Sequence, residues 1–163
     1  LDAATYDALA RACAARADTA GAVGWFQSME AAGVRPAPST FAAVIEAFAR
    51  RGEVSTAEAW LGKLREAGLT PGVEAYIAMM RACAVSGDLP SAQGWLAKLR
   101  ADGLEPTEAA FGVLLDAHAE NGNLEGIEET FREMEAEGLR PSRGSFEAAL
   151  RACAKCGESD RAE

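Results

Sequence analysis

The sequence predicts an all-α fold, an α-solenoid of repeated helical hairpins, and three observations support this. Prolines, glycines and aromatic residues recur at a step of 35 residues along the chain. Alanine, the residue with the highest helix propensity, is the most frequent apolar residue, whereas aromatic residues make up only 7%. Within each unit, apolar residues recur twice at helical spacing. Because one short amphipathic hairpin cannot bury its apolar stripes alone, we expect stacked copies to share a core.

The register of the repeat follows from several columns of like residues. Prolines lie at Pro36, Pro71, Pro106 and Pro141, and aromatic residues at Tyr6, Phe41, Tyr76, Phe111 and Phe146. Two glycine columns keep the same step, at Gly33, Gly68, Gly103 and Gly138 and at Gly52, Gly87, Gly122 and Gly157. The predicted units are residues 3–37, 38–72, 73–107 and 108–142, with a partial fifth unit at 143–163. Since the pattern starts and stops within a unit, we expect the sequence to be part of a longer protein.

Residues 38–72 illustrate the two helices expected in each unit. Ser39 or Thr40 is predicted to cap the first helix, and Gly52 to end it in a left-handed conformation. Ser55 is predicted to cap the second helix, with Glu58 completing a capping box. The apolar stripes are Phe41, Val44, Ile45 and Phe48 in the first helix and Ala57, Trp60, Leu61 and Leu64 in the second. Gly68 is predicted to end the second helix.

The net charge of −9 is concentrated in one unit. Residues 108–142 contain nine acidic residues against two arginines. Within this unit, residues 125–137 predict an amphipathic helix with a highly acidic outer face. Such a face is usually only solvated, but it would also suit docking to a basic protein surface.

The sequence contains no arrangement typical of catalysis or of cofactor binding. Cys13, Cys83 and Cys153 share a predicted packing column with His118, which has no nucleophile in register. The Cys153-x-x-Cys156 spacing suits a metal, but a structural zinc site needs about four ligands and no second pair exists. A recurrent tryptophan, at Trp25, Trp60 and Trp95, is interpreted as packing between repeats. We therefore expect no enzyme activity, cofactor, metal or small-molecule substrate, and no apolar stretch long enough to span a membrane.

The order of these features resembles the pentatricopeptide-repeat family. The segments STFAAVIEAFARRGEVSTAEAWLGKLREAGLTP and EAYIAMMRACAVSGDLPSAQGWLAKLRADGLEP carry an early aromatic residue, a glycine after the first helix, and a closing Gly-Leu-x-Pro. The resemblance covers nearly the whole chain and implies a right-handed superhelix. It also implies an organellar protein, of chloroplast or mitochondrion, that binds single-stranded RNA at roughly one base per repeat.

The resemblance assigns base reading to the residue after the early aromatic and the residue after the closing proline. These pairs are Asp7 with Ala37, Ala42 with Gly72, Ile77 with Thr107, and Gly112 with Ser142, and Glu147 begins a fifth. Of these, only Ser142 matches the residue types typical of a base-reading pair, and alanine, glycine and isoleucine cannot hydrogen-bond a base edge. The column two positions before the aromatic, which usually packs on the base, holds Ala4, Ser39, Glu74, Ala109 and Gly144. Base reading is therefore expected to be degenerate.

A column of alternating charge is predicted on the same face, four residues beyond the first base-facing position. It contains Arg11, Glu46, Arg81, Asp116 and Arg151. Neighbouring repeats could pair these charges along the groove, or the arginines could contact phosphates. The candidates for phosphate contact are Arg50, Arg81 and Lys155.

Two functional hypotheses follow. In the first, the chain is an organellar RNA-binding module with degenerate base-reading positions. In the second, it is a non-catalytic scaffold that docks onto a large organellar assembly, such as a ribosome, a photosynthetic complex or a respiratory complex. Family resemblance favours the first hypothesis, whereas the weak base-facing pairs and the acidic helix favour the second.

Overall fold

The computed structural model describes residues 1–157, apart from the side chain of Cys156, and in this part of the chain all the regular secondary structure is helical. The end of the predicted fifth unit, residues 158–163, and the Cys156 thiol of the Cys153-x-x-Cys156 spacing lie outside the described part. The described residues form nine α-helices, as the repeat pattern predicts. These are α1 (Ala3–Ala15), α2 (Thr19–Ala31), α3 (Pro38–Ala49), α4 (Val54–Glu66), α5 (Val73–Val85), α6 (Leu89–Ala101), α7 (Glu108–Glu120), α8 (Leu124–Ala136) and α9 (Arg143–Cys156).

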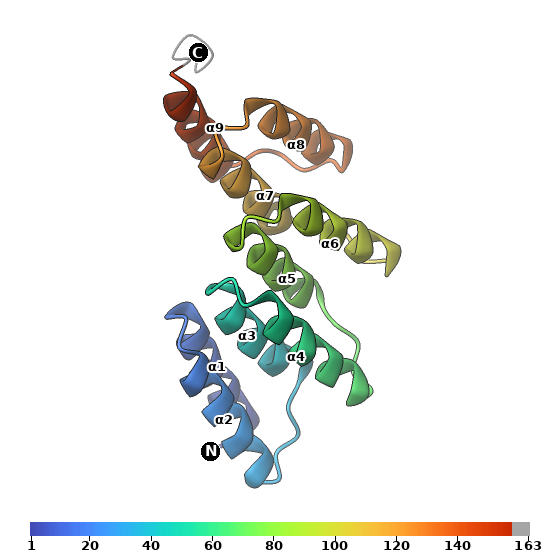
Figure 1. Ribbon diagram of the computed structural model, residues 1–163. Helices are drawn as coiled ribbons and strands as arrows, with labels where there is room; N and C mark the ends of the chain where they lie inside the picture. Colours follow the sequence, from blue (N-terminus) through green and yellow to red (C-terminus); the bar gives the residue numbers. More distant parts are fainter. Residues whose placement is uncertain (158–163) are drawn as a thin grey trace.

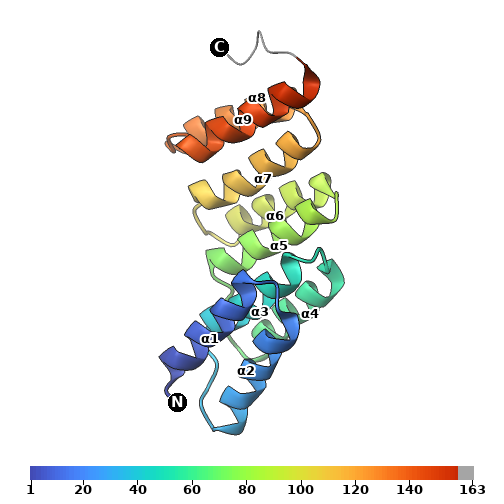
Figure 2. The ribbon, with the colours of Figure 1, turned by 90° about the vertical axis from the view of Figure 1, so that its left-hand side faces the viewer.

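The helices form two layers of an elongated stack, with α1 and α9 at opposite ends (Figure 1). The odd-numbered helices form one row, in which each contacts the odd-numbered helix of the next repeat. Each even-numbered helix packs behind this row, against the first helix of its own repeat and of the following repeat. Figure 2 shows the row of odd-numbered helices facing the viewer. Because each repeat contacts only its neighbours, the all-α solenoid predicted from the sequence is confirmed.

The helices begin at other residues than the sequence predicted. Helix α3 begins at Pro38, whose missing N–H costs nothing in the first turn, so the predicted cap at Ser39 or Thr40 is wrong. Helix α4 begins at Val54, directly after Glu53, so the predicted capping box of Ser55 is wrong as well. The physical reason is that the chain leaves the left-handed glycine and re-enters a helix after a single residue. At that position, the side chains of Asp18, Asp88 and Asn123 cap the even-numbered helices α2, α6 and α8.

The predicted glycine stops are confirmed. Gly52 follows the end of α3 with φ +70°, and Gly68 follows the end of α4 with φ +73°. Residues other than glycine are strained in this region, which explains why glycine predominates in the columns, although Ala17 takes the same position in the first repeat with φ +54°. Each reversal directs the next helix back along the previous one and so keeps the first helices in one row.

The core is continuous across the repeats and includes Phe41, Tyr76 and Phe111 of the aromatic column. Tyr76 and Phe111 are 1% and 0% exposed, and Phe26 packs edge-on against Phe41 with ring centroids 4.7 Å apart. Trp60 and Trp95 are buried, and the ammonium groups of Lys63 and Lys98 lie over their rings at 4.1 and 3.8 Å. The interpretation of these two tryptophans as packing residues is confirmed. None of the helices in the described residues combines the length and hydropathy of a bilayer-spanning segment.

Candidate nucleic-acid interface

The row of odd-numbered helices carries two grooves. The first groove, of about 430 Å³, crosses α1, α3 and α5, and the second, of about 330 Å³, lies between α7 and α9. The charged residues and the predicted base-facing residues of the first groove are Arg11, Ala42, Glu46, Arg50, Glu74, Ile77 and Arg81. Those of the second groove are Glu108, Gly112, Asp116, Ser142, Glu147 and Arg151. Both grooves exist because small side chains occupy the centre of this face, as at Ala43 and Gly144.

The grooves bring together some of the predicted base-facing residues but not all. Ala42 and Ile77 line the first groove, and Gly112, Ser142 and Glu147 line the second. The remaining four, Asp7, Ala37, Gly72 and Thr107, line neither of them. The pairs are thus split, except for Gly112 with Ser142, which face the same groove.

Asp7 and Gly112, two of the predicted base-facing residues, differ in how accessible they are to a ligand. The carboxylate of Asp7 is occupied, because it accepts a hydrogen bond from Thr40 Oγ1 at 3.2 Å and lies 3.2 Å from Arg11 Nε. At Gly112 the space is open, since a Cβ would meet no atom within 4 Å. A ligand can therefore approach the backbone at Gly112 more closely than at a position with a side chain.

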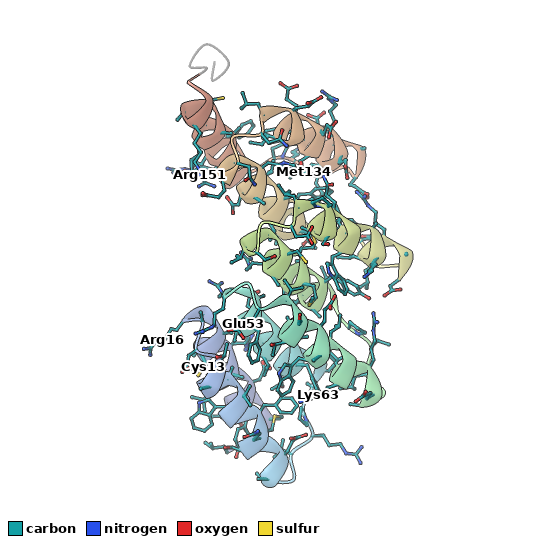
Figure 3. The ribbon with its side chains drawn as sticks, viewed as in Figure 1. Cys13, Arg16, Glu53, Lys63, Met134 and Arg151 are labelled. Atoms are coloured by element: carbon teal, nitrogen blue, oxygen red, sulfur yellow. The ribbon has the colours of Figure 1, made fainter. Side chains whose placement is uncertain are left out.

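The charge column pairs across repeats in two places, as predicted. Arg81 Nε lies 3.1 Å from Glu46 Oε1, and Arg151 pairs with Asp116. Arg11 departs from the prediction, because it pairs with Asp7 in its own helix and leaves Glu46 to other partners. Figure 3 shows Arg151 on the α7–α9 side of the molecule, whereas Met134 lies between α8 and α7.

All the predicted phosphate candidates lie on the odd-helix face but are engaged by carboxylates. Glu46 accepts a hydrogen bond from Arg50 Nε at 2.8 Å and also lies beside Arg81. Lys155 Nζ donates to the backbone oxygen of Glu120 at 2.6 Å and to its carboxylate at 3.1 Å. Sequence reasoning missed the Glu46–Arg50 pair, although the spacing of four residues within one helix is its usual signal. The side chains of Arg50, Arg81 and Lys155 can therefore bind phosphate only in competition with Glu46 and Glu120.

His118 lies outside both grooves and is 4% exposed. The Oδ1 atom of Asn123 accepts the Gly126 N–H, which leaves its NH₂ group to donate to His118 Nδ1 at 3.2 Å. Burial lowers the pKa of the imidazole below its usual 6.5, against a smaller opposing effect of Glu129. The packing interpretation of His118 is therefore confirmed. Cys83 and Cys153 of the same column are buried and free, as expected, and Cys13 is free and half-buried.

The lowered pKa of His118 predicts acid-sensitive stability. In the unfolded chain the imidazole takes up its proton near pH 6.5, whereas the buried ring resists protonation, so the stabilisation is fully present above pH 6.5. It is expected to fall as the pH drops from 6.5 through the folded pKa. The pKa values of Asp2 and Asp88 are lowered from 3.8 by hydrogen bonds from Thr5 and Ser91, so their contributions are lost only at lower pH.

Urea unfolding at a series of pH values would measure this effect. The control is His118→Cys, which installs the residue of the same column at Cys83. The variant should lose the pH dependence just below pH 6.5, and an unchanged dependence would show that another group causes it.

The acidic helix α8 carries its charge on the outer face, as predicted. Ile127 and Met134 are buried, while Arg100 of α6 bridges Glu133 and Glu137 at 3.1 and 3.0 Å. In the described residues, the carboxylates of Glu125, Glu129 and Glu135 have no ion pair. Part of the charge thus links neighbouring repeats, and the rest faces solvent.

Stacked helical hairpins, with grooves that cross successive first helices, define an α-solenoid repeat protein. A family model described as the pentacotripeptide-repeat region of PRORP matches residues 2–114 and, in a second match, residues 61–162. The chain belongs to the pentatricopeptide-repeat family. Among curated proteins, none matched the sequence.

Several solved structures are similar to the chain. PPR10 in complex with an 18-nt psaJ RNA element is 19% identical with a TM-score of 0.84, over 96% of this chain and 23% of PPR10. A second structure of PPR10, from maize, is 25% identical, with a TM-score of 0.74 over 99% of this chain and 23% of PPR10. The PPR domain of Arabidopsis thaliana protein-only RNase P 1 in complex with tRNA is 14% identical, with a TM-score of 0.72. That match covers 98% of this chain and 84% of the domain.

Proposed function

We propose that this chain is an RNA-binding segment of a pentatricopeptide-repeat protein and that it holds single-stranded RNA along the odd-helix face. The observation that carries the proposal is that both grooves coincide with positions assigned to base reading, at Ala42 and Ile77 and at Gly112, Ser142 and Glu147. The complexes of PPR10 with RNA and of an RNase P repeat domain with tRNA support it, since both share this fold. We also propose that these residues contribute binding and not catalysis.

The chemistry of the face predicts weak base selectivity. Ala42, Ile77 and Gly112 offer only methyl groups, methylenes or backbone to a base, so they contribute contact area without hydrogen bonds to a base edge. The arginines can donate several hydrogen bonds to one phosphate, but each must first leave a carboxylate. Affinity is therefore expected to come from the phosphates and to depend strongly on salt.

The test is binding of this chain, and of its full-length parent, to pools of single-stranded RNA across a salt titration. We expect a Kd on the order of 1 μM or tighter at low salt, rising steeply with salt concentration. Replacement of Arg50, Arg81 and Lys155 with glutamine should weaken binding severalfold. Replacement of Arg132, on the opposite layer in α8, is the matched control and should have little effect. Absence of binding by both proteins would refute the proposal.

A scaffold within an organellar assembly is the second candidate, and a specific observation favours it. The carboxylates of Glu125, Glu129 and Glu135 on α8 lack ion pairs in the described residues, and all three residues are exposed. A basic protein surface would complement them. If RNA does not bind, cross-linking of the full-length protein in organelle extracts should recover partners through α8.

We propose an organellar location, chloroplast or mitochondrion, on the family resemblance alone. The similar structures do not decide it, because a further structure that shares this fold, 15% identical with a TM-score of 0.68, is of a nuclear proteinaceous RNase P from A. thaliana. Imaging of the full-length protein with an organelle marker would test the location, and a nuclear or cytosolic signal would contradict it.

A further inference from the structure

Glu46 occupies a central place in the first groove and contacts arginines of two repeats. Its Oε1 atom lies 2.8 Å from Arg50 Nε in the same helix and 3.1 Å from Arg81 Nε in α5. The Glu46 side chain is only 22% exposed, so water screens it less than it screens most charges on this face. One carboxylate therefore engages two of the three arginines that line the groove.

The two grooves differ in the sign of their charge. The first is lined by three arginines and two carboxylates, those of Glu46 and Glu74. The second is lined by three carboxylates and one arginine, Arg151, which is paired with Asp116. A chain of phosphates is thus attracted at the first groove and repelled at the second.

The contacts that Glu46 makes are weak enough for a phosphate to replace. Arg81 Nε is buried and lies near the carboxylate, but its N–H is not aligned for a hydrogen bond to it. The Arg50 side chain is 41% exposed, and a pair of that exposure contributes little to stability. A backbone phosphate, with its two non-bridging acceptor oxygens, would give Arg81 Nε an aligned partner and would offer Arg50 an acceptor in place of the carboxylate.

We infer that the first groove is the phosphate-binding part of the odd-helix face and that Glu46 is a built-in competitor that limits its affinity. The inference rests on the proposed function. The phosphate takes the place of Glu46 beside the two arginines, and the carboxylate, which remains nearby, repels it. The second groove contributes little to affinity, because its carboxylates outnumber its single arginine.

The test is the substitution Glu46→Gln in the whole chain. Glutamine keeps the size of the side chain, frees both arginines and removes the repulsion. We expect RNA binding to tighten about threefold to tenfold at moderate salt, with the slope of log K against log salt steeper by ~0.7 for each additional phosphate that the arginines neutralise. Thermal unfolding should be almost unchanged.

Two controls separate pairing from net charge. Glu74→Gln removes the same charge from the same groove, but Glu74 has no ion pair in the described residues, so its effect should be clearly smaller. Asp116→Asn frees Arg151 in the second groove and should change binding little.

A second probe measures anion binding without RNA. Inorganic tripolyphosphate is added, and its binding is followed by NMR of the arginine side-chain N–H groups.

The outcomes separate the inference from the proposed function. If the wild-type chain binds RNA and Glu46→Gln binds no more tightly than Glu74→Gln, the inference is overturned and the RNA function stands. If no protein binds RNA but Glu46→Gln alone tightens tripolyphosphate binding, Glu46 is an anion competitor and the RNA function fails. If neither probe responds to Glu46→Gln, the inference is overturned.

Discussion

Replacement of Phe111 with alanine is expected to lower the free energy of unfolding by about 3–5 kcal/mol. The side chain is 0% exposed and belongs to α7, which packs against the odd-numbered helices on both sides and against α6 and α8. The substitution would leave a cavity where the third and fourth repeats meet. Because the stability of a solenoid depends on the contacts between neighbours, this loss should also uncouple α7 to α9 from the rest. Urea unfolding followed by circular dichroism would measure it, with a second transition as the sign of uncoupling.

The same column provides the control. Phe146 is the equivalent residue in α9, but it is 56% exposed and packs on Phe131 with ring centroids 5.7 Å apart. Its replacement with alanine should cost less than about 1 kcal/mol, as is usual for exposed positions. If both variants lost the same free energy of unfolding, burial of the side chain would not explain how much each aromatic residue of the column contributes to stability.

The fold could be predicted because its signals are redundant. The aromatic column predicted buried residues at the same place in successive repeats, and its first four members, which include Tyr76 and Phe111, are buried, whereas Phe146 is exposed. The glycines after the helices, such as Gly52, were predictable because only a left-handed residue reverses the chain so abruptly. Because several columns of like residues share the same 35-residue period, the repeat boundaries do not depend on the interpretation of any single residue.

The helix caps could not be predicted in the same way, because several residues compete for each start. Ser39, Thr40 and Ser55 are all good capping types, yet α3 begins at Pro38 and α4 at Val54. A cap contributes only about 1 kcal/mol, whereas the distance from the preceding glycine fixes where the second helix can begin. The local preference is therefore overridden by chain geometry.

The ion pairs of the candidate site were only partly predictable for a similar energetic reason. Arg11 could pair with Asp7, four residues away in the same helix, or with Glu46 in the next repeat, and it pairs with Asp7. The sequence does not decide between partners that each contribute less than about 1 kcal/mol. The grooves themselves depend on absent side chains, as at Gly112, and on how the helices cross. Spacing alone therefore placed the residues on one face, but it could not show which of them share a groove.

Replacement of Gly126 with alanine is expected to destabilise the fold by about 1–3 kcal/mol, although alanine favours helices. A Cβ at this position would lie 2.3 Å from Cε1 and Nδ1 of His118 and 2.9 Å from the Asn123 amide nitrogen. The imidazole would have to turn away and lose its contact with Asn123. In repeat 3 the same two positions hold Cys83 and Ser91, so a smaller partner tolerates a Cβ there.

Two further variants test this cause through urea unfolding. Gly94→Ala, in α6, meets no atom within 4 Å and should stabilise the protein by about 0.5–1 kcal/mol, because it only removes backbone freedom. In the background of His118→Cys, the loss caused by Gly126→Ala should largely disappear, since the two positions are directly coupled. If Gly126→Ala lowered the free energy of unfolding equally in the wild-type protein and in His118→Cys, the strain would lie in the helix backbone and not at the imidazole. Recovery would show that the lone histidine of the chain is retained in the core only because its neighbour has no side chain.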